Sequence, residues 1–197
     1  YNHSYPQLLS YLQTISNVIS KSHSAPCLTT LKFVCFLNFV KFEKFLFQLI
    51  LLYAFVLPNF SLLEKISNLK LSTPIIYSGG IKNVDDAVNV IKFGSDRIMF
   101  ETVFFKNSQI VEKISNKIGS QGLILSLPVV KVNNKIFRYC YLSKKLFKIS
   151  NEVNKFFEKK ILSECLITDV INEGSVNNFN FSILKKIDLK IQMIIFG

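Results

Sequence analysis

The sequence predicts an α/β fold of the (β/α)8 TIM-type barrel class, and three observations lead to this prediction. From Pro58 onward, short apolar segments alternate with amphipathic ones, which is typical of a parallel sheet covered by helices. Neither a G-x-G-x-x-G motif nor a P-loop occurs, which disfavours an open dinucleotide-binding sheet. A hydrophobic strand followed by glycine occurs at residues 75–79 and again at 194–197, about half of a ~250-residue barrel apart.

The individual elements follow from periodicity and from capping residues. Apolar residues recur at helical spacing over 62–69, and residues 74–77 read as a short buried strand that ends in Ser-Gly-Gly. Asn83 can cap the next helix, and residues 97–100 form the next strand. Further along we expect helices at 110–118, 151–160 and 181–187, strands at 123–127, 165–170 and 191–196, and a β-hairpin at 131–141 that turns at Asn133 and Asn134.

The chain divides into two parts of different character. Residues 1–57 lack glycine and show no clean alternation, so we expect an atypical N-terminal segment followed by a partial barrel over 58–197. Residues 45–57 are strongly apolar but fall short of the roughly 20 residues that a spanning helix needs, so a membrane anchor is the alternative to a buried strand or core helix. Because the chain stops at the second strand–glycine pattern, we expect a fragment that lacks the last strand–helix unit.

Charge and cysteine content narrow the function classes. The net charge is +11, but Arg97 and Arg138 are the only arginines and the lysines are spread along the chain, so we expect an anionic small-molecule ligand and not a nucleic acid. The histidines and cysteines lack the spacing of a metal site, so no metal or other cofactor is expected, and the thiols should be reduced in a cytoplasmic protein. The cysteines are Cys27, Cys35, Cys140 and Cys165.

From Pro58 to Gly197 the sequence resembles the cyclase subunit of imidazole glycerol phosphate synthase, including relatives from surface-polysaccharide gene clusters. The segments that carry this resemblance are PIIYSGGIKNVDDAVNVIKFGSDRIMFET at 74–102, VFFKNSQIVEKISNKIGSQ at 103–121 and ECLITDVINEGSVNNFN at 164–180. A related histidine-pathway isomerase shares the half-barrel plan but matches less well. The resemblance implies a lyase-type cyclase that forms an imidazole ring in histidine or related surface-sugar biosynthesis, with ammonia delivered through the barrel core by a partner glutaminase subunit.

The resemblance also implies where a phosphorylated substrate is held. Glycines before a helix N-terminus allow backbone N–H groups to approach a phosphate closely. One position departs from the family: Glu101 replaces an asparagine, and its charge should repel phosphate. The implied substrate-binding and phosphate-binding residues are Gly79, Gly80, Thr102, Glu173, Gly174, Ser175 and Gly197.

At the opposite barrel end, the resemblance implies an ammonia gate and a contact with the glutaminase. Arg97 stands where the family has lysine, Glu164 matches the family glutamate, and Asp96 matches an acidic contact to the partner. A charged residue just before a strand is also common as a plain surface group, and that alternative stays open.

The catalytic positions depart from the family pattern. The family uses two aspartates as general acid and base, but Thr29 and Pro128 stand at those positions, and proline cannot transfer a proton. Asp169 is the remaining candidate, and one carboxylate does not make the pair. We therefore expect negligible cyclase turnover, and the alternative function is a non-catalytic ammonia conduit that binds a glutaminase or amidotransferase.

Overall fold

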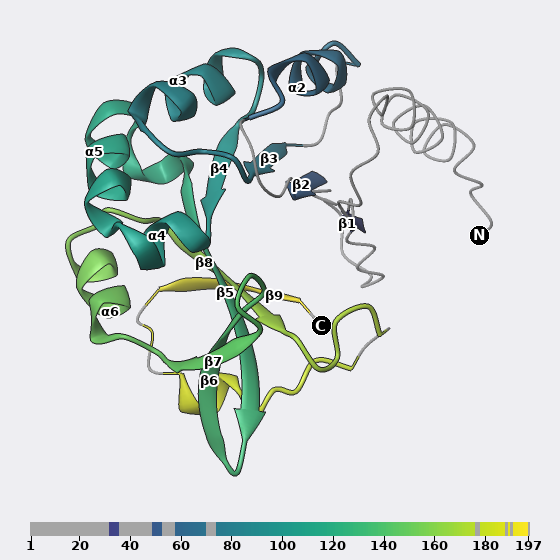
Figure 1. The fold of residues 1–197 in the computed structure, drawn as a ribbon, viewed down its shortest axis with the longest axis vertical. Coiled ribbons are helices and arrows are strands. Elements are labelled where there is room, and N and C mark those ends of the chain that lie inside the picture. The colour runs from purple at the N-terminus through teal and green to yellow at the C-terminus, as the bar shows by residue number, and fades with distance from the viewer. Residues whose placement is uncertain are drawn as a thin grey trace, which may run out of the picture.

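The computed structural model describes residues 32–35, 49–52, 58–69, 74–175, 178–187, 189 and 191–196 (Figure 1). Strands and helices alternate along most of this part of the chain. The strands are β1 (Lys32–Cys35), β2 (Leu49–Leu52), β3 (Ile75–Ser78), β4 (Arg97–Phe100), β5 (Leu123–Val132), β6 (Lys135–Cys140), β7 (Lys145–Lys148), β8 (Glu164–Asp169) and β9 (Gln192–Phe196). The helices are α2 (Phe60–Ser67), α3 (Val84–Lys92), α4 (Thr102–Lys106), α5 (Ser108–Ile118) and α6 (Asn151–Glu158), with short 3-10 turns η1 (Ser120–Gly122) and η2 (Leu184–Lys186).

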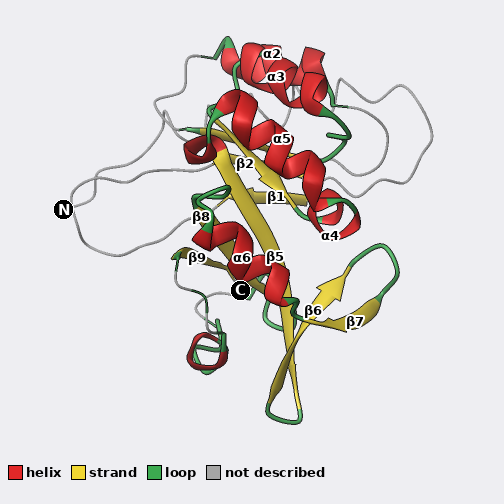
Figure 2. Ribbon diagram, turned by 90° about the vertical axis from the view of Figure 1, so that its left-hand side faces the viewer, coloured by secondary structure: helices red, strands yellow, loops and turns green. Residues whose placement is uncertain are grey.

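The sheet is wound in the manner of a barrel. Strands β2, β3, β4, β5, β8 and β9 are parallel, and each pairs with the next in chain order, so the strand order never reverses. A doubly wound sheet reverses its order and places helices on both faces. Here the helices lie along one side of the strands in both views (Figures 1 and 2). The α/β class with a parallel sheet is therefore confirmed, and the winding is that of the (β/α)8 family.

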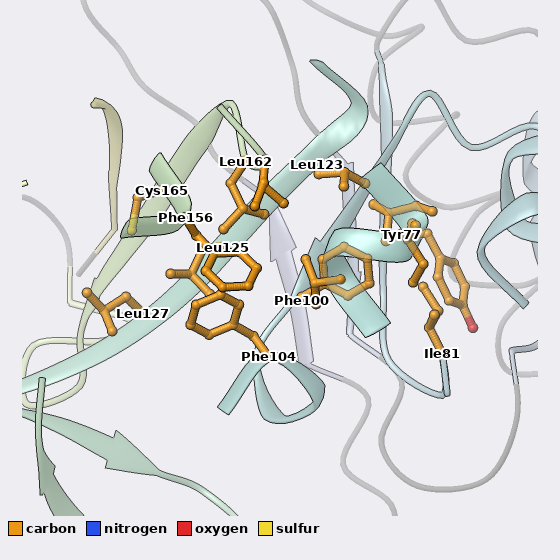
Figure 3. Close-up of a cluster of buried hydrophobic side chains, with 14 of the residues drawn as sticks. Tyr77, Ile81, Phe100, Phe104, Leu123, Leu125, Leu127, Phe156, Leu162 and Cys165 are labelled. Carbon is orange, nitrogen blue, oxygen red and sulfur yellow. The ribbon is translucent and has the colours of Figure 1, made fainter. Parts of the chain in front are cut away.

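The two faces of the sheet carry different residues. On the helix-covered face, alternate strand residues join helix residues in the main core, which is centred on Tyr77, Phe100, Leu125 and Ile167. Figure 3 shows part of this cluster, in which the Phe104 and Phe156 rings meet edge to face at 5.0 Å. The opposite face, here called the inner face, carries a second cluster made by Ile76, Met99, Ile124 and Leu166, with Ile194 and Phe196 packed against it.

A side-chain cap fixes the start of α3 at Asn83, as the sequence predicts. The Asn83 side chain accepts a hydrogen bond from the Asp86 backbone N at 2.8 Å, and the Asp86 carboxylate accepts one from the Lys82 backbone N at 2.9 Å. Gly94, at φ +103°, ends the α3 region against α2, where an added Cβ would overlap the Ser67 side chain. A glycine is needed there for both conformation and space.

The hairpin is confirmed, and it is longer than predicted. Asn133 and Asn134 have φ values of 45° and 65°, as a two-residue turn between twisted strands requires. Strand β5 continues through Pro128, which lies between its pairing with β4, ending at Leu125, and its pairing with β6, beginning at Val129. A residue without an N–H is tolerated in that gap.

Three local expectations differ from the structure. The helix expected at 181–187 is wrong: only η2 forms, because the Asn180 side chain accepts hydrogen bonds from the Ser182 N and Oγ and turns the chain there. Helix α4 was not predicted because five residues are too few to show a helical period. Strand β7 was not predicted because it is exposed along its whole length, unlike the buried four-residue strands β3 and β4.

The N-terminal part contributes to the same sheet. Strand β2 lies within the apolar segment 45–57 and pairs in parallel with β3, with Leu49 beside Ile75; the rest of that segment lies outside the described residues. Thr29 and Cys27 also lie outside them. None of the helices that the structure describes is both long and apolar enough to cross a bilayer. The division at residue 57 stays a prediction.

Candidate functional site

The side chains on the inner face change from charged to apolar to hydroxyl-bearing along the parallel strands. Charged side chains, Arg97 and Glu164, lie at the amino end of the strands. The apolar cluster of Ile76, Met99, Ile124 and Leu166 fills the middle. The strand alternation then brings buried hydroxyl residues and one carboxyl residue to the carboxyl end, namely Ser78, Ser126, Thr168 and Glu101. The two ends therefore offer different chemistry, separated by an apolar layer.

At the amino end, the structure brings the two predicted gate residues together. Arg97 on β4 donates from Nη1 to Glu164 Oε2 on β8 at 2.8 Å, across 67 residues of sequence. Arg97 Nη2 donates to the Ser163 hydroxyl at 2.8 Å, and that hydroxyl donates to the Leu123 carbonyl at 2.9 Å. Both charged side chains are less than one-fifth exposed, so the pair is shielded from solvent. The Nε of Arg97 is buried and has no hydrogen-bond partner among the described residues.

Asp96, the predicted partner contact, is bound within the sheet. Its Oδ2 accepts a hydrogen bond from the Ile75 backbone N at 2.7 Å, and its own N donates to the Ile75 carbonyl at 2.9 Å. Asp96 therefore ties the start of β4 to the start of β3, which positions Arg97. A contact with a partner protein through Asp96 stays a prediction.

At the carboxyl end, the predicted ligand residues follow three strands of the same sheet. Gly79 and Gly80 follow β3 at φ 104° and 69°, and Thr102 begins α4 just after β4. Glu173, Gly174 and Ser175 follow β8, while Gly197 lies outside the described residues. Because the carboxyl ends of parallel strands meet at one edge, these residues share one border of the sheet. We call Gly79, Gly80, Glu101, Thr102 and Glu173 the carboxyl-end rim.

The antiparallel strands β5, β6 and β7, here called the hairpin, contact residues next to this rim. The guanidinium of Arg138 lies between two aromatic rings, 4.0 Å from the centroid of Phe105 and 4.6 Å from that of Phe147. Only 9% of Arg138 is exposed, and no salt bridge joins it to a carboxylate of the described residues. From the turn after β6, the Tyr141 hydroxyl donates to Glu173 Oε2 at 2.8 Å. The hairpin is thus attached both to α4 and to the loop after β8.

Among the described residues, Glu101 has a carboxyl group whose pKa departs clearly from its ordinary value. Burial raises the pKa of Glu101 from its ordinary value of 4.5 to about 7, the positive charge of Arg138 opposes this rise, and the negative charge of Glu173 adds to it. Burial and the hydrogen bond to Glu173 also raise the pKa of the Tyr141 hydroxyl. Glu101 is therefore close to half protonated near neutral pH.

Pro128, which replaces the family aspartate, and Asp169, the remaining candidate for proton transfer, lie on different faces of the sheet. Pro128 is buried on the inner face beside Thr168, where the family resemblance expects an aspartate. Asp169 alternates away from that face, and its Oδ2 accepts hydrogen bonds from Asn172 Nδ2 at 2.7 Å and the Asn180 backbone N at 3.0 Å. This geometry favours a role for Asp169 in holding the loop after β8. Among the described residues, no group of three His, Cys, Asp or Glu side chains could hold a metal ion.

Sequence reasoning missed two members of this end of the molecule. Arg138 and Tyr141 were assigned only to a hairpin, and no local pattern shows that the hairpin folds back toward Glu101 and Glu173. One signal was available: Arg138 is one of two arginines in a lysine-rich chain. The other arginine, Arg97, also proves to be engaged on the sheet.

Comparison with known proteins gives a family match over most of the chain. Residues 57–197 match the family described as histidine biosynthesis protein. Similar proteins include an imidazole-4-carboxamide isomerase of Methanosphaera stadtmanae, 30% identical over 129 residues, which cover 66% of this chain and 53% of that protein. A similar isomerase of Methanococcus maripaludis is 29% identical over 126 residues, covering 63% of this chain and 52% of its own length.

Relatives named as cyclase subunits are also found. The imidazole glycerol phosphate synthase subunit HisF of Sulfurisphaera tokodaii is 24% identical over 144 residues, which cover 68% of this chain and 55% of that protein. The chain spans about half the length of the curated relatives it matches.

Proposed function

Because this chain belongs to the family of histidine biosynthesis proteins, we propose that it acts as a cyclase-type subunit of an ammonia-using synthase of the imidazole glycerol phosphate type. In this proposal a phosphorylated ligand binds at the carboxyl-end rim, and a glutaminase partner docks at the amino end of the strands. The pathway would be histidine biosynthesis or the related modification of surface sugars. Relatives named as isomerases and as cyclase subunits both match, so the choice between them needs an observation in this chain.

The observation that carries the choice is the Arg97–Glu164 pair. An isomerase rearranges one substrate and needs no second reactant from the far end of the barrel. A cyclase that uses ammonia needs a path along the inner face, and a shielded charge pair at the amino end is suited to open and close such a path. Ammonia is small and neutral, so parting of Arg97 from Glu164 would be enough to admit it.

At the carboxyl-end rim, the chain's own groups suit a phosphorylated ligand. Gly79 and Gly80 have positive φ values and lie between the end of β3 and Asn83, the N-cap of α3, where their backbone N–H groups would be available to a phosphate. The Thr102 hydroxyl would add a donor beside them. On the other side of β5, Glu173 and Ser175 would contact the hydroxyl groups of a sugar.

A second candidate function, a non-catalytic ammonia conduit, is favoured by Pro128. The family's second catalytic aspartate is absent, and Asp169 is turned away from the inner face. Ring closure requires protons to move on opposite sides of the substrate, so the missing carboxylate predicts very slow chemistry. A conduit needs only the docking surface and the gate.

Two measurements test these functions. Isothermal titration of the full chain with a glutaminase-type subunit should show a complex, and Glu164→Gln should leave complex formation intact while reducing ammonia transfer to a coupled acceptor reaction. Turnover with supplied ammonium separates the two functions: a rate near a typical enzyme value of about 10 per second supports the cyclase, and a rate far below it, which Pro128 predicts, supports the conduit. Absence of any complex would remove both functions, whereas turnover at the typical value would remove the conduit.

A further inference from the structure

Strand β7 forms a free edge of the sheet. It pairs with β6 on one side, and no strand of the described residues pairs with it on the other side. In Figure 2 the ribbon of β6 and β7 lies apart from α2, α3 and α5. All of residues 141–148 are exposed. An edge strand carries backbone N–H and C=O groups with which another strand can pair, so β7 is open to an added strand.

Apolar side chains are exposed on both faces of β7. Leu146 is 43% exposed and Phe147 is 41% exposed. The Arg138 guanidinium lies 4.6 Å from the centroid of the Phe147 ring, which places Phe147 on the Arg138 side of the strand. Because residues alternate between two faces along a strand, Lys145 shares that face, and Leu146 and Lys148 share the other. Each face of β7 thus combines one lysine with one apolar residue.

The charge around this edge is of one sign. Every charged residue between positions 123 and 150 is a lysine or an arginine. Lys144, Lys145 and Lys148 form no salt bridge with a carboxylate of the described residues. Lysines on an edge strand can serve simply to prevent aggregation. That role alone does not account for Leu146 and Phe147, because apolar side chains exposed between the lysines favour association.

The residue pattern of β7 defines the chemistry of a strand that would pair with it. Directly opposed residues of two paired strands share a face, where opposite charges attract and like charges repel. The matching segment therefore has two acidic residues that flank two apolar ones, a pattern that reads the same in both strand directions. A second copy of β7 would match the apolar residues but would set lysine against lysine. A bilayer would contact only one face of β7, whereas an added strand contacts both.

We propose that the free edge of β7 binds an extended segment of a partner protein in which two acidic residues flank two apolar residues. The segment adds a strand to the sheet: its backbone pairs with β7, and its acidic side chains meet Lys145 and Lys148. This interaction goes beyond the proposed function and does not depend on it. The glutaminase is placed at the amino end of the strands, whereas β7 belongs to the hairpin beside the carboxyl-end rim.

The first experiment tests strand addition with a synthetic peptide of sequence TEVIET, capped at both ends and titrated into the 15N-labelled full chain. We expect amide shifts confined to β7 and its neighbours, with slower amide exchange within 145–148 as N–H groups acquire partners. The same peptide N-methylated at its valine and isoleucine keeps its charge but loses backbone donors, and it should bind about tenfold more weakly. Equal binding of the two peptides would show charge attraction without strand addition and would overturn the proposal.

The second experiment exchanges the charges. Lys145→Glu with Lys148→Glu should weaken the binding of TEVIET about tenfold and strengthen that of the peptide TKVIKT by a similar factor. The matched control, Lys113→Glu with Lys117→Glu, changes the net charge equally through two exposed lysines of α5 and should bind TEVIET as wild type does. Equal weakening in the two double variants would mean general attraction by the net charge of +11, which contradicts a site at β7.

Two further outcomes would assign the edge to something else. Binding of oligouridylate RNA or of phosphatidylserine vesicles through Lys145 and Lys148, without binding of TEVIET, would overturn the protein partner in favour of that ligand. No binding of TEVIET, RNA or vesicles at about 1 mM ligand would leave the lysines as protection of the edge only and would equally overturn the proposal. Either result leaves the proposed function at the inner face unchanged, because that function is tested by glutaminase binding and turnover.

Discussion

Both ends of the inner face hold ionisable side chains that are partly shielded from solvent, but these side chains have oppositely charged neighbours at one end and a like-charged neighbour at the other. At the amino end, Arg97 and Glu164 carry opposite charges and meet at 2.8 Å. At the carboxyl end, Glu101 lies near Glu173, a like charge, and the nearby Arg138 forms no salt bridge with any carboxylate of the described residues. The first arrangement pairs each charge with an opposite one. In the second, burial and the negative charge of Glu173 raise the pKa of Glu101.

This difference teaches how the two ends can serve different roles. A matched pair resists separation, because parting its members exposes two charges to a poorly solvated region. A carboxyl near a like charge has a raised pKa, so its charge depends on pH. The apolar layer of Ile76, Met99, Ile124 and Leu166 separates the two regions in space.

The largest expected effect comes from breaking the matched pair on one side only. Arg97→Met leaves Glu164 shielded without its partner and should lower the free energy of unfolding by about 3 kcal/mol. Replacing both residues, in Arg97→Met with Glu164→Leu, should recover most of that loss because no charge is then stranded. Urea denaturation of the two single variants and the double variant measures this. Additive losses in the double variant would show that the pair is not coupled.

At the carboxyl end of the strands, Glu101 should make the free energy of unfolding depend on pH. Glu101 holds its proton to about pH 7 in the folded state but loses it near 4.5 when unfolded, so the free energy of unfolding should fall as pH rises between these values. Glu101→Gln removes this fall and should be more stable than wild type by about 2 kcal/mol at pH 8, with little difference at pH 4. Urea denaturation across pH 4–8 gives the comparison. A larger stabilisation at pH 4 than at pH 8 contradicts the assigned direction.

A smaller effect is expected where a carboxylate is satisfied by neutral donors. Asp169 accepts from both Asn172 Nδ2 and the Asn180 backbone N through one oxygen, Oδ2, so Asp169→Ala loses both bonds. The expected cost is about 1.5 kcal/mol, with faster amide exchange at Asn180. If Asp169 served instead in proton transfer, the variant would change activity without changing that exchange rate.

The smallest effect on the free energy of unfolding is expected at the exposed hydrogen bond between Tyr141 and Glu173. Tyr141→Phe removes the hydrogen bond to Glu173 and should cost about 0.5 kcal/mol, since the pair lies at the surface. Amide exchange in β6 and β7 should increase, while α3 and α5 stay as protected as in wild type. Unchanged exchange in the hairpin would mean that Arg138, between Phe105 and Phe147, is sufficient to hold it.

Much of the fold could be predicted from local sequence. The strand at 97–100 and the cap at Asn83 match the structure, because a buried strand and an N-cap are decided by a few neighbouring residues. The helix expected at 181–187 failed because the apolar spacing of Ile183 and Ile187 suggested a period, while the turn at Asn180 left too little chain for one. The reach of the hairpin could not be predicted, since its contacts come from distant strands.

The sequence by itself determined the barrel-type alternation, the glycines at the end of β3 and the departures at Glu101 and Pro128. Only the tertiary structure decided that Arg97 meets Glu164, and that Arg138 and Tyr141 come to Glu101 and Glu173. The physical reason is the sequence distance over which each interaction acts. Periodicity and capping act within one or two turns of chain, whereas charge partners on neighbouring strands are chosen by the register of the whole sheet.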